Sequence, residues 1–149
     1  MSEGAHASYR SVLVTRNDAS ELARMTEWIE EVCTAAGLSR RTSLALHLCM
    51  DEAVANIMAH GLGASRAREI VLSVVREEAN VVLTVDDDGE PFDPTAVPPP
   101  HPPDMLDDAP IGGFGIHLMR EFSRGIEYRR ACGRNQLRLT FVEAASAPK

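Results

Sequence analysis

Lysine is nearly missing from this 149-residue sequence, because 14 of its 15 basic residues are arginine and the one lysine is Lys149. A P-loop needs a lysine after its glycines, a eukaryotic-type protein kinase needs one on its third strand, and a Schiff-base enzyme needs one as nucleophile. Lys149 stands at the end of the sequence and fits none of these positions. The sequence therefore excludes all three classes of site.

Cysteine pairs and long apolar runs are also missing. Cys33, Cys49 and Cys132 are odd in number and lack the close spacing of a zinc site or a redox motif, so we expect reduced, structural thiols in a cytoplasmic protein. No stretch approaches the roughly 20 apolar residues that span a bilayer, and residues 1–10 lack the core of a signal peptide. We therefore expect no membrane partner.

The net charge of −7 comes from one segment. Residues 86–108 hold eight of the 22 acidic residues and no basic one, which leaves 14 acidic and 15 basic residues elsewhere. Proteins that bind nucleic acid carry a basic surface, which this chain lacks. We expect no nucleic-acid partner.

Hydrophobic periodicity predicts the order β-α-α-β-β, a long loop, then α-β-β. Length and composition fit one domain over residues 1–149, and this order favours an α+β fold, a two-layer sandwich of a mixed, mostly antiparallel sheet with helices on one face. The strands are expected at 9–15, 69–77, 81–86, 126–130 and 136–142, and the helices at 20–36, 39–61 and from the glycines near 113 to about 123.

Proline marks the long loop. Eight of the nine prolines fall between Pro91 and Pro110, a density that neither a helix nor an interior strand tolerates. Loops of this length in a small domain are usually functional. The chain ends, residues 1–8 and 143–149, are expected to be flexible tails.

Glu52 and Asn56 stand four residues apart on an otherwise apolar helix, and therefore on one face of it. Small residues flank them there, which leaves space for a ligand: Ala45, Cys49, Ala55 and Ala59. A buried carboxylate is costly unless it is paired or bound to a cation. Either the pair is functional, or Glu52 merely contacts an arginine or the backbone and Asn56 faces solvent.

Glycines carry two further motifs. Asp87 and Gly89 form a D-x-G step at a strand end, where a carboxylate could accept a hydrogen bond from an exocyclic amine; an ordinary acidic turn is the alternative. Gly112, Gly113 and Gly115 open a helix, where backbone N–H groups can approach a phosphate; a flexible joint is the alternative.

The segments LALHLCMDEAVANIMAHG, VDDDGEPFDP and GGFGIHLMREF, followed by IEYRR, occur here in that order. In this the chain resembles the GHKL (HATPase) superfamily of ATPases, and most closely the RsbW-type anti-sigma factor serine kinases, from Tyr9 to Phe141. The resemblance implies the Bergerat ATP-binding fold, with ATP and Mg²⁺ as cofactors. It also makes residues 92–112 an ATP lid, which their prolines would stiffen.

Roles follow from the resemblance residue by residue. Glu52 would be the general base and Asn56 would bind Mg²⁺. Asp87 would accept from the adenine amino group, with Gly89 allowing close approach. The remaining nucleotide-binding positions implied are Gly112, Gly113, Gly115 and Ile116. His60 either lines the site or is a structural helix-end residue, and Arg120 and Arg124 either meet phosphates or a partner or are solvated. Pro91 stands where many superfamily members have a second glycine of the D-x-G-x-G box.

The function implied is that of an ATP-dependent serine kinase and anti-sigma-like regulator in a partner-switching pathway. Its substrate would be a STAS-type anti-sigma factor antagonist, its alternate partner a sigma factor or an equivalent target, and a PPM-type serine phosphatase would act in the same pathway. A homodimer is a further expectation. The alternatives are a non-catalytic, nucleotide-dependent binding module and an orphan histidine-kinase catalytic domain, which predicts acid-labile phosphohistidine. The acidic residues Asp104, Asp107 and Asp108 are expected to face solvent or an arginine-bearing partner.

Overall fold

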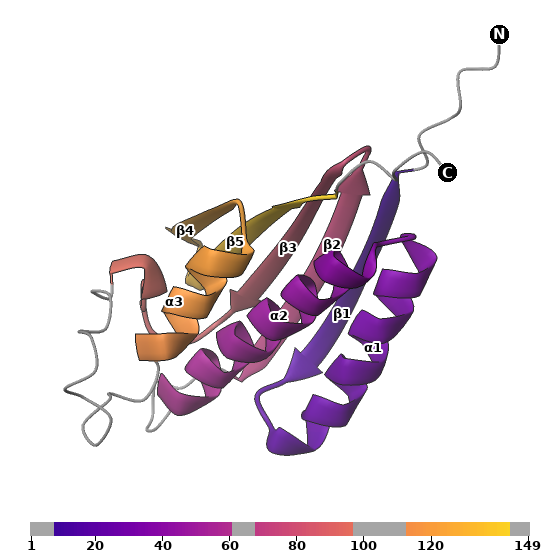
Figure 1. Ribbon diagram of the computed structural model, residues 1–149. Coiled ribbons are helices and arrows are strands. Elements are labelled where there is room, and N and C mark those ends of the chain that lie inside the picture. The colour runs from indigo at the N-terminus through magenta and orange to yellow at the C-terminus, as the bar shows by residue number, and fades with distance from the viewer. Residues whose placement is uncertain (1–7, 61–67, 97–112, 144–149) are drawn as a thin grey trace, which may run out of the picture.

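The computed structural model describes residues 8–60, 68–96 and 113–143. In these residues three helices cover one face of a five-stranded sheet, which confirms the expected α+β sandwich (Figure 1). The strands are β1 (Tyr9–Arg16), β2 (Glu69–Glu77), β3 (Asn80–Asp87), β4 (Gly125–Ala131) and β5 (Arg134–Val142). The helices are α1 (Leu22–Ala35), α2 (Arg40–His60) and α3 (Gly113–Phe122), and the short 3₁₀ turns are η1 (Ala19–Glu21) and η2 (Pro94–Ala96).

The sheet has the order β1-β2-β3-β5-β4, and all four ladders between neighbouring strands are antiparallel. β5 comes after β4 in the sequence but lies between β3 and β4. Its pairing with β3 sets Asp87 directly opposite Asn135, and Asp86 opposite Gln136. The ends of two strands that are far apart in the sequence therefore meet at one edge of the molecule.

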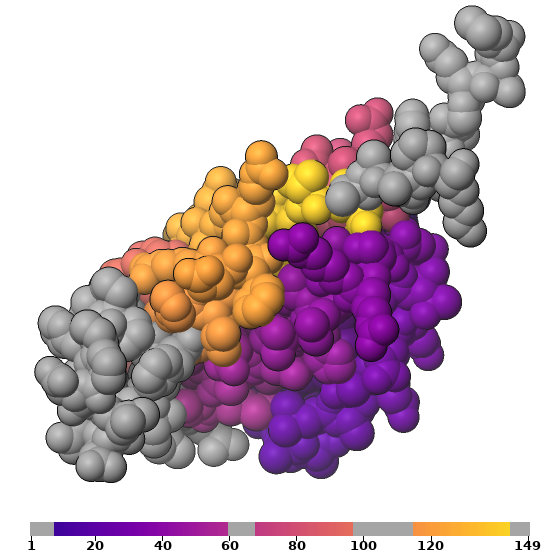
Figure 2. Space-filling view, in the orientation of Figure 1, coloured from indigo at the N-terminus to yellow at the C-terminus, as the bar shows by residue number. Residues whose placement is uncertain are grey.

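The core lies between the sheet and the helices. Successive strand residues point to opposite faces, so every second residue of β2 and β3 turns toward the helices. α1, α2 and α3 pack their apolar faces on these residues, and Figure 2 shows the three helices forming much of one face of the molecule. The residues that β2 and β3 contribute to the core are all at most 2% exposed: Ile70, Leu72, Val74, Val81, Leu83 and Val85.

No helix in the described part of the chain has both the length and the apolarity to cross a membrane.

None of these helices covers the opposite face of the sheet (Figure 1). Val12 and Val14 of β1 point to that side and are 48% and 54% exposed, and half-buried valines of β2 and β3 continue the apolar surface. We call this surface, made of Val12, Val14, Val71, Val75 and Val82, the valine face.

The start of α2 corrects one expectation. Ser39 caps the helix, because its Oγ accepts from the backbone N–H of Thr42 at 3.2 Å. The N–H of Ser39 donates in turn to both carboxylate oxygens of Glu143, at 3.1 Å from each. Glu143 is 7% exposed, so the prediction that it belongs to a flexible tail is wrong. The chain stays fixed at Glu143 because this carboxylate holds the N-terminus of α2.

Candidate nucleotide-binding site

The elements that carry the three predicted motifs adjoin one another. α2 packs on both α3 and β3. The C-terminal half of α2, the N-terminus of α3 and the end of β3 lie at the same end of the molecule (Figure 1). Residues that are spread over about half of the sequence are thereby brought to one region of the structure.

The pair on α2 lies at the border of the core. Asn56 is 8% exposed, and none of the other described residues makes a hydrogen bond to its amide. Glu52 is half-buried. Two of the small neighbours expected beside the pair, Ala45 and Cys49, are buried, whereas Ala55 and Ala59 are exposed. The pair therefore has core on one side and solvent on the other, as a residue pair that binds a soluble ligand requires.

Glu52 reaches across to α3. A Cβ atom placed on Gly115 would lie 2.6 Å from Oε2 of Glu52, closer than real Cβ contacts allow. Alanine at 115 would therefore displace this carboxylate, which is the far end of a flexible side chain, so glycine lets Glu52 lie here, a reason beyond the phosphate contact that the sequence predicted. The contact also places the carboxylate beside the first turn of α3.

The first turn of α3 has the properties of an anion site. The first backbone N–H groups of a helix have no partner within the helix, and the helix dipole makes this end positive. Gly113 and Gly115 both lie in this turn. The side chain of Ile116 is fully buried in the core, so only its backbone could face a nucleotide. Gly112 lies outside the described residues.

Asp87 is the buried acid of the turn after β3, with 6% of its surface exposed. Its Oδ1 atom accepts from the backbone N–H of Gly89 at 2.9 Å and from Nδ2 of Asn135 at 3.1 Å. The described residues place no donor on Oδ2. Because no fully buried side-chain N or O atom among them lacks a partner, Oδ2 keeps some access to solvent. One oxygen of this carboxylate is thus fixed by the protein and the other is available to a ligand.

The surroundings of Asp87 disfavour its ionised form. Burial raises the pKa of this carboxyl above its ordinary value, and the neighbouring charges of Asp86 and Asp88 raise it too, while the hydrogen bonds from Gly89 and Asn135 counteract the shift. A carboxylate that is kept in such surroundings has a function more often than a surface carboxylate does.

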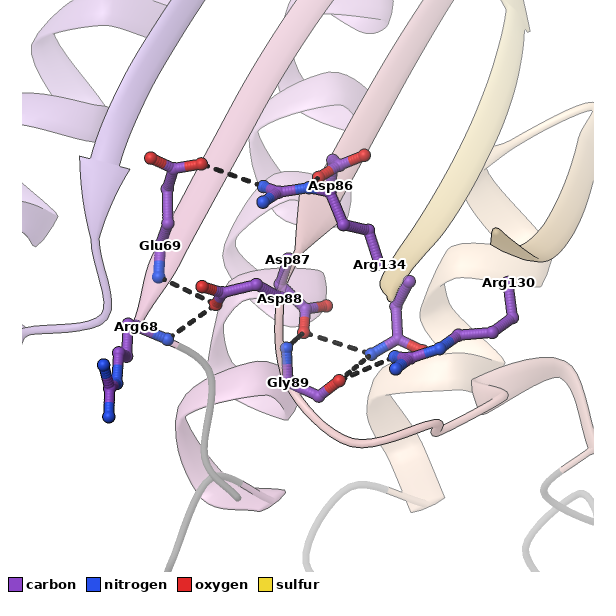
Figure 3. A network of polar contacts seen from close by, with 9 residues as sticks. Arg68, Glu69, Asp86, Asp87, Asp88, Gly89, Arg130 and Arg134 are labelled. Atoms are coloured by element: carbon purple, nitrogen blue, oxygen red, sulfur yellow. Dashed lines mark hydrogen bonds and ion pairs between the residues drawn. The ribbon is translucent and has the colours of Figure 1, made fainter. Parts of the chain in front are cut away.

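Asp86 and Asp88, the acids on either side, make structural contacts (Figure 3). Asp86 points to the opposite face of the sheet and accepts from Nε of Arg134, whose Nη2 donates to Glu69 at 3.0 Å. Oδ1 of Asp88 accepts from the backbone N–H groups of Arg68 at 2.7 Å and Glu69 at 3.0 Å. Of the three consecutive aspartates, only Asp87 therefore lies at the candidate site with an oxygen that a ligand could use.

Two arginines hold the backbone that follows, Arg130, which the sequence did not single out, and Arg120. Nη1 of Arg130 donates to the carbonyl of Gly89 at 2.6 Å, as Figure 3 shows. Nη2 of Arg120 donates to the carbonyl of Thr95 at 2.8 Å, so this arginine is not simply solvated. Arg124 is exposed, as expected. The turn before the predicted lid is thus tied to β4, and the first residues of the lid, through Ala96, are tied to α3. The rest of the lid lies outside the described residues, as do Asp104, Asp107 and Asp108.

A metal cluster and the two cysteines of the helices are the other sources of chemistry to consider in the described residues. No three His, Cys, Asp or Glu side chains among them are grouped to hold a metal ion. Burial, together with the charge of Glu52, raises the pKa of Cys49 to about 12, and burial raises that of Cys33. Both thiols are therefore protonated at neutral pH and are not nucleophiles. The side chain of His60 is outside the described residues.

Comparison with known proteins places this arrangement in a family. The sequence profile of the histidine kinase-like ATPase domain matches residues 15–141. The chain is 36% identical over 122 residues to the serine/threonine-protein kinase BtrW of Bordetella bronchiseptica, an alignment that covers 82% of this chain and 84% of that protein.

A solved structure has the same fold. The chain superposes on the crystal structure of the RsbU and RsbW domains of Rv1364c from Mycobacterium tuberculosis with a TM-score of 0.65 and 13% identity. The match covers 92% of this chain but only 33% of that one, so the chain spans about a third of the longer protein. Since the family profile covers most of the sequence and the fold agrees with it, the chain belongs to the histidine kinase-like ATPase family, as the resemblance to RsbW-type kinases predicted.

Proposed function

We propose that this protein is an ATP-dependent serine kinase of a partner-switching pathway, which phosphorylates a STAS-type antagonist protein. The observation that carries the proposal is the convergence of three groups without described protein partners: the Oδ2 atom of Asp87, the amide of Asn56 and the carboxylate of Glu52 beside Gly115. The kinase activity named for the Bordetella relative, which is similar over most of both chains, supports it.

Each group has a role that its chemistry allows. Oδ2 of Asp87 accepts a hydrogen bond from the 6-amino group of adenine. The first turn of α3 binds phosphate oxygens through its backbone N–H groups, which serve in place of the missing P-loop lysine. The amide oxygen of Asn56 is a suitable Mg²⁺ ligand, and the amide, which keeps some access to solvent and has no partner among the described residues, fits such an ion; Mg²⁺, when bound, would neutralise phosphate charge.

Glu52 is the proposed general base. It takes the proton of the substrate serine hydroxyl while the serine oxygen bonds to the γ-phosphorus and ADP leaves. Its place beside the α3 N-terminus puts it next to the proposed phosphate site, which is where the attacking hydroxyl must be.

A phosphotransfer assay tests the proposal. Purified protein, a STAS-type antagonist and labelled ATP should give acid-stable phosphoserine on the antagonist. Glu52→Gln should lower the rate by about 10²- to 10⁴-fold and leave ATP bound, because the proton acceptor is lost and the size is kept. Asp51→Asn is the matched control: Asp51 adjoins Glu52 in the sequence, but its side chain is 54% exposed and pairs with His47.

The outcomes separate the alternatives. Equal rates for Glu52→Gln and wild type would refute the base assignment. Tight ATP binding without transfer to the antagonist would favour a nucleotide-dependent binding module, and acid-labile phosphate would favour histidine as the acceptor.

The valine face is the surface that we propose for a second copy of the chain. Exposed apolar patches on soluble proteins commonly mark interaction sites, and Val12 and Val14 are about half exposed. A molar mass of one chain in light scattering at micromolar concentration would refute the homodimer.

A further inference from the structure

Asn135 is a buried amide at the start of β5, 6% exposed and opposite Asp87 in the β3–β5 ladder. Its Nδ2 atom donates to Oδ1 of Asp87 at 3.1 Å and to the carbonyl of Glu90 at 2.7 Å. Its Oδ1 atom accepts from the backbone N–H of Phe92 at 3.3 Å and from the hydroxyl of Tyr128. One side chain therefore joins the acid of the turn, the backbone after it and β4.

The surroundings fix which way this amide points. Nδ2 faces a carboxylate and a carbonyl, both of which only accept, and Oδ1 faces a backbone N–H group, which only donates. A flipped amide would set its oxygen against those two acceptors and its nitrogen against the N–H. Asn135 therefore always presents a donor to Asp87.

That donor decides which carboxylate oxygen the ligand meets. Gly89 and Asn135 both donate to Oδ1, so the carboxylate has a defined orientation and Oδ2 is turned away from both. With Gly89 alone, the carboxylate could rotate, or water could take the place of the amide. Gln136 cannot replace Asn135, because neighbouring residues of a strand point to opposite faces.

We propose that Asn135 is the positioning residue for base recognition, which orients the Asp87 carboxylate so that the site prefers purines with a 6-amino group. This inference rests on the proposed function, in which Asp87 accepts from that amino group. Asn135 itself acts through Asp87 and the backbone of residues 89–92.

The test compares two nucleotides that differ only in the contact concerned. ATP and purine riboside triphosphate share the phosphates and the ribose, but the second lacks the 6-amino group. Dissociation constants of both are measured by calorimetry with Mg²⁺ for the wild type, Asn135→Leu and Tyr128→Phe. The second variant removes only the hydroxyl that holds the amide, so it keeps the test valid where Asn135→Leu fails to fold.

We expect the preference of the wild type for ATP over the analogue to be about tenfold or more, the size of a hydrogen bond to a charged group. Asn135→Leu should abolish most of that preference, and Tyr128→Phe should reduce it severalfold, while affinity for the analogue changes little in either variant. Arg130→Met is the matched control, because Arg130 holds the same turn through the Gly89 carbonyl without contacting Asp87. Arg130→Met should change the dissociation constants of ATP and of the analogue by the same factor.

Two results would overturn the inference, and they differ in what they leave standing. Equal losses for ATP and the analogue in the Asn135 and Tyr128 variants would make Asn135 a structural residue only, with the role of Asp87 intact. Absence of any ATP preference in the wild type, unchanged by Asp87→Asn, would refute the base contact itself and the inference with it. In the Asp87→Asn background, Asn135→Leu should cause no further loss of preference.

Discussion

Replacing Asp87 with asparagine should turn the base contact from an acceptor into a donor. In the wild type, Oδ1 receives the N–H groups of Gly89 and Asn135, so in the variant the amide oxygen must occupy that position. The NH₂ group then takes the place of Oδ2 and faces the ligand. Its rotation is prevented, because the flipped amide would set a donor against two donors.

The size of the effect follows from the contact that is lost. A hydrogen bond to a charged group contributes about 1.5–3 kcal/mol, so the affinity for ATP should fall roughly ten- to a hundredfold. Inosine triphosphate carries a carbonyl oxygen where ATP carries the amino group. The variant should therefore bind it better relative to ATP than the wild type does, because the new donor meets an acceptor.

The stability of the Asp87→Asn variant should not fall, although its affinity for ATP does. The folded-state pKa of Asp87 is raised, mainly by burial, so the folded protein holds this proton more tightly than the unfolded chain does. Ionised Asp87 thus destabilises the fold as the pH rises from the unfolded-state pKa through the raised folded-state pKa, and the penalty is complete above that raised pKa. Asp87→Asn removes the charge, and we expect an equal or higher Tm at pH 7.

Calorimetric titration with ATP and inosine triphosphate measures the affinity for ATP and the ratio of the two affinities, and thermal melts measure Tm. Unchanged affinity for ATP in a folded variant, or an unchanged ratio between the two nucleotides, would refute the base contact at Asp87. A large drop in Tm would mean that the carboxylate holds the turn together instead.

Two further predictions concern the helix ends. Gly115→Ala should displace the Glu52 carboxylate, which would lie 2.6 Å from the new Cβ atom, and should lower kcat for phosphotransfer on the order of a hundredfold with little change in ATP affinity. Because alanine favours helix more than glycine does, Tm should hold or rise; a fall in Tm with normal kcat would contradict this. Glu143→Gln should cost about 1 kcal/mol of unfolding free energy at pH 7, since the charged acceptor at the α2 N-terminus is lost. Burial alone would raise the pKa of Glu143, but hydrogen bonds from Ser39 and Thr42 lower it below its ordinary 4.5. The stability difference between wild type and Glu143→Gln should therefore be full above pH 4.5 and vanish as the pH falls through the lowered pKa, and a pH-independent difference in denaturant titrations would refute the role of the charge.

Periodicity in the sequence was sufficient to predict the layers of the fold. β2 and β3 begin and end within one residue of their predicted bounds, because β-branched residues alternate there between core and surface. α2 was placed within about one residue at each end by its caps. The pair Glu52 and Asn56 could be found because both positions follow directly from helical spacing.

The alternation in β5 held more information than the prediction used. Leu137, Leu139 and Phe141 face the core, so the same parity turns Asn135 and Glu143 inward as well. A polar residue at an inward strand position needs a partner. Continued by two residues each way, the pattern predicts both buried polar residues, although not what they bind.

Their partners could not be predicted, because they depend on the tertiary structure. Asn135 meets Asp87 only because β5 lies between β3 and β4, and hydrophobic alternation contains no information on strand order. The approach of Glu52 to Gly115 likewise depends on the distance between two helix axes. Local patterns therefore predicted the candidate ligand-binding residues, and missed those that orient them.

The position of β5 also bears on when the protein becomes able to bind nucleotide during its own synthesis. Asn135 is translated 48 residues after Asp87, and β5 is the last strand of the sheet to be made. Until β5 pairs with β3, a nascent chain already contains Glu52, Asn56 and Asp87 but has no amide to orient the Asp87 carboxylate. Domains fold largely as units as they leave the ribosome. On the proposed role of Asn135, selectivity for ATP is therefore acquired only when β5 joins the sheet.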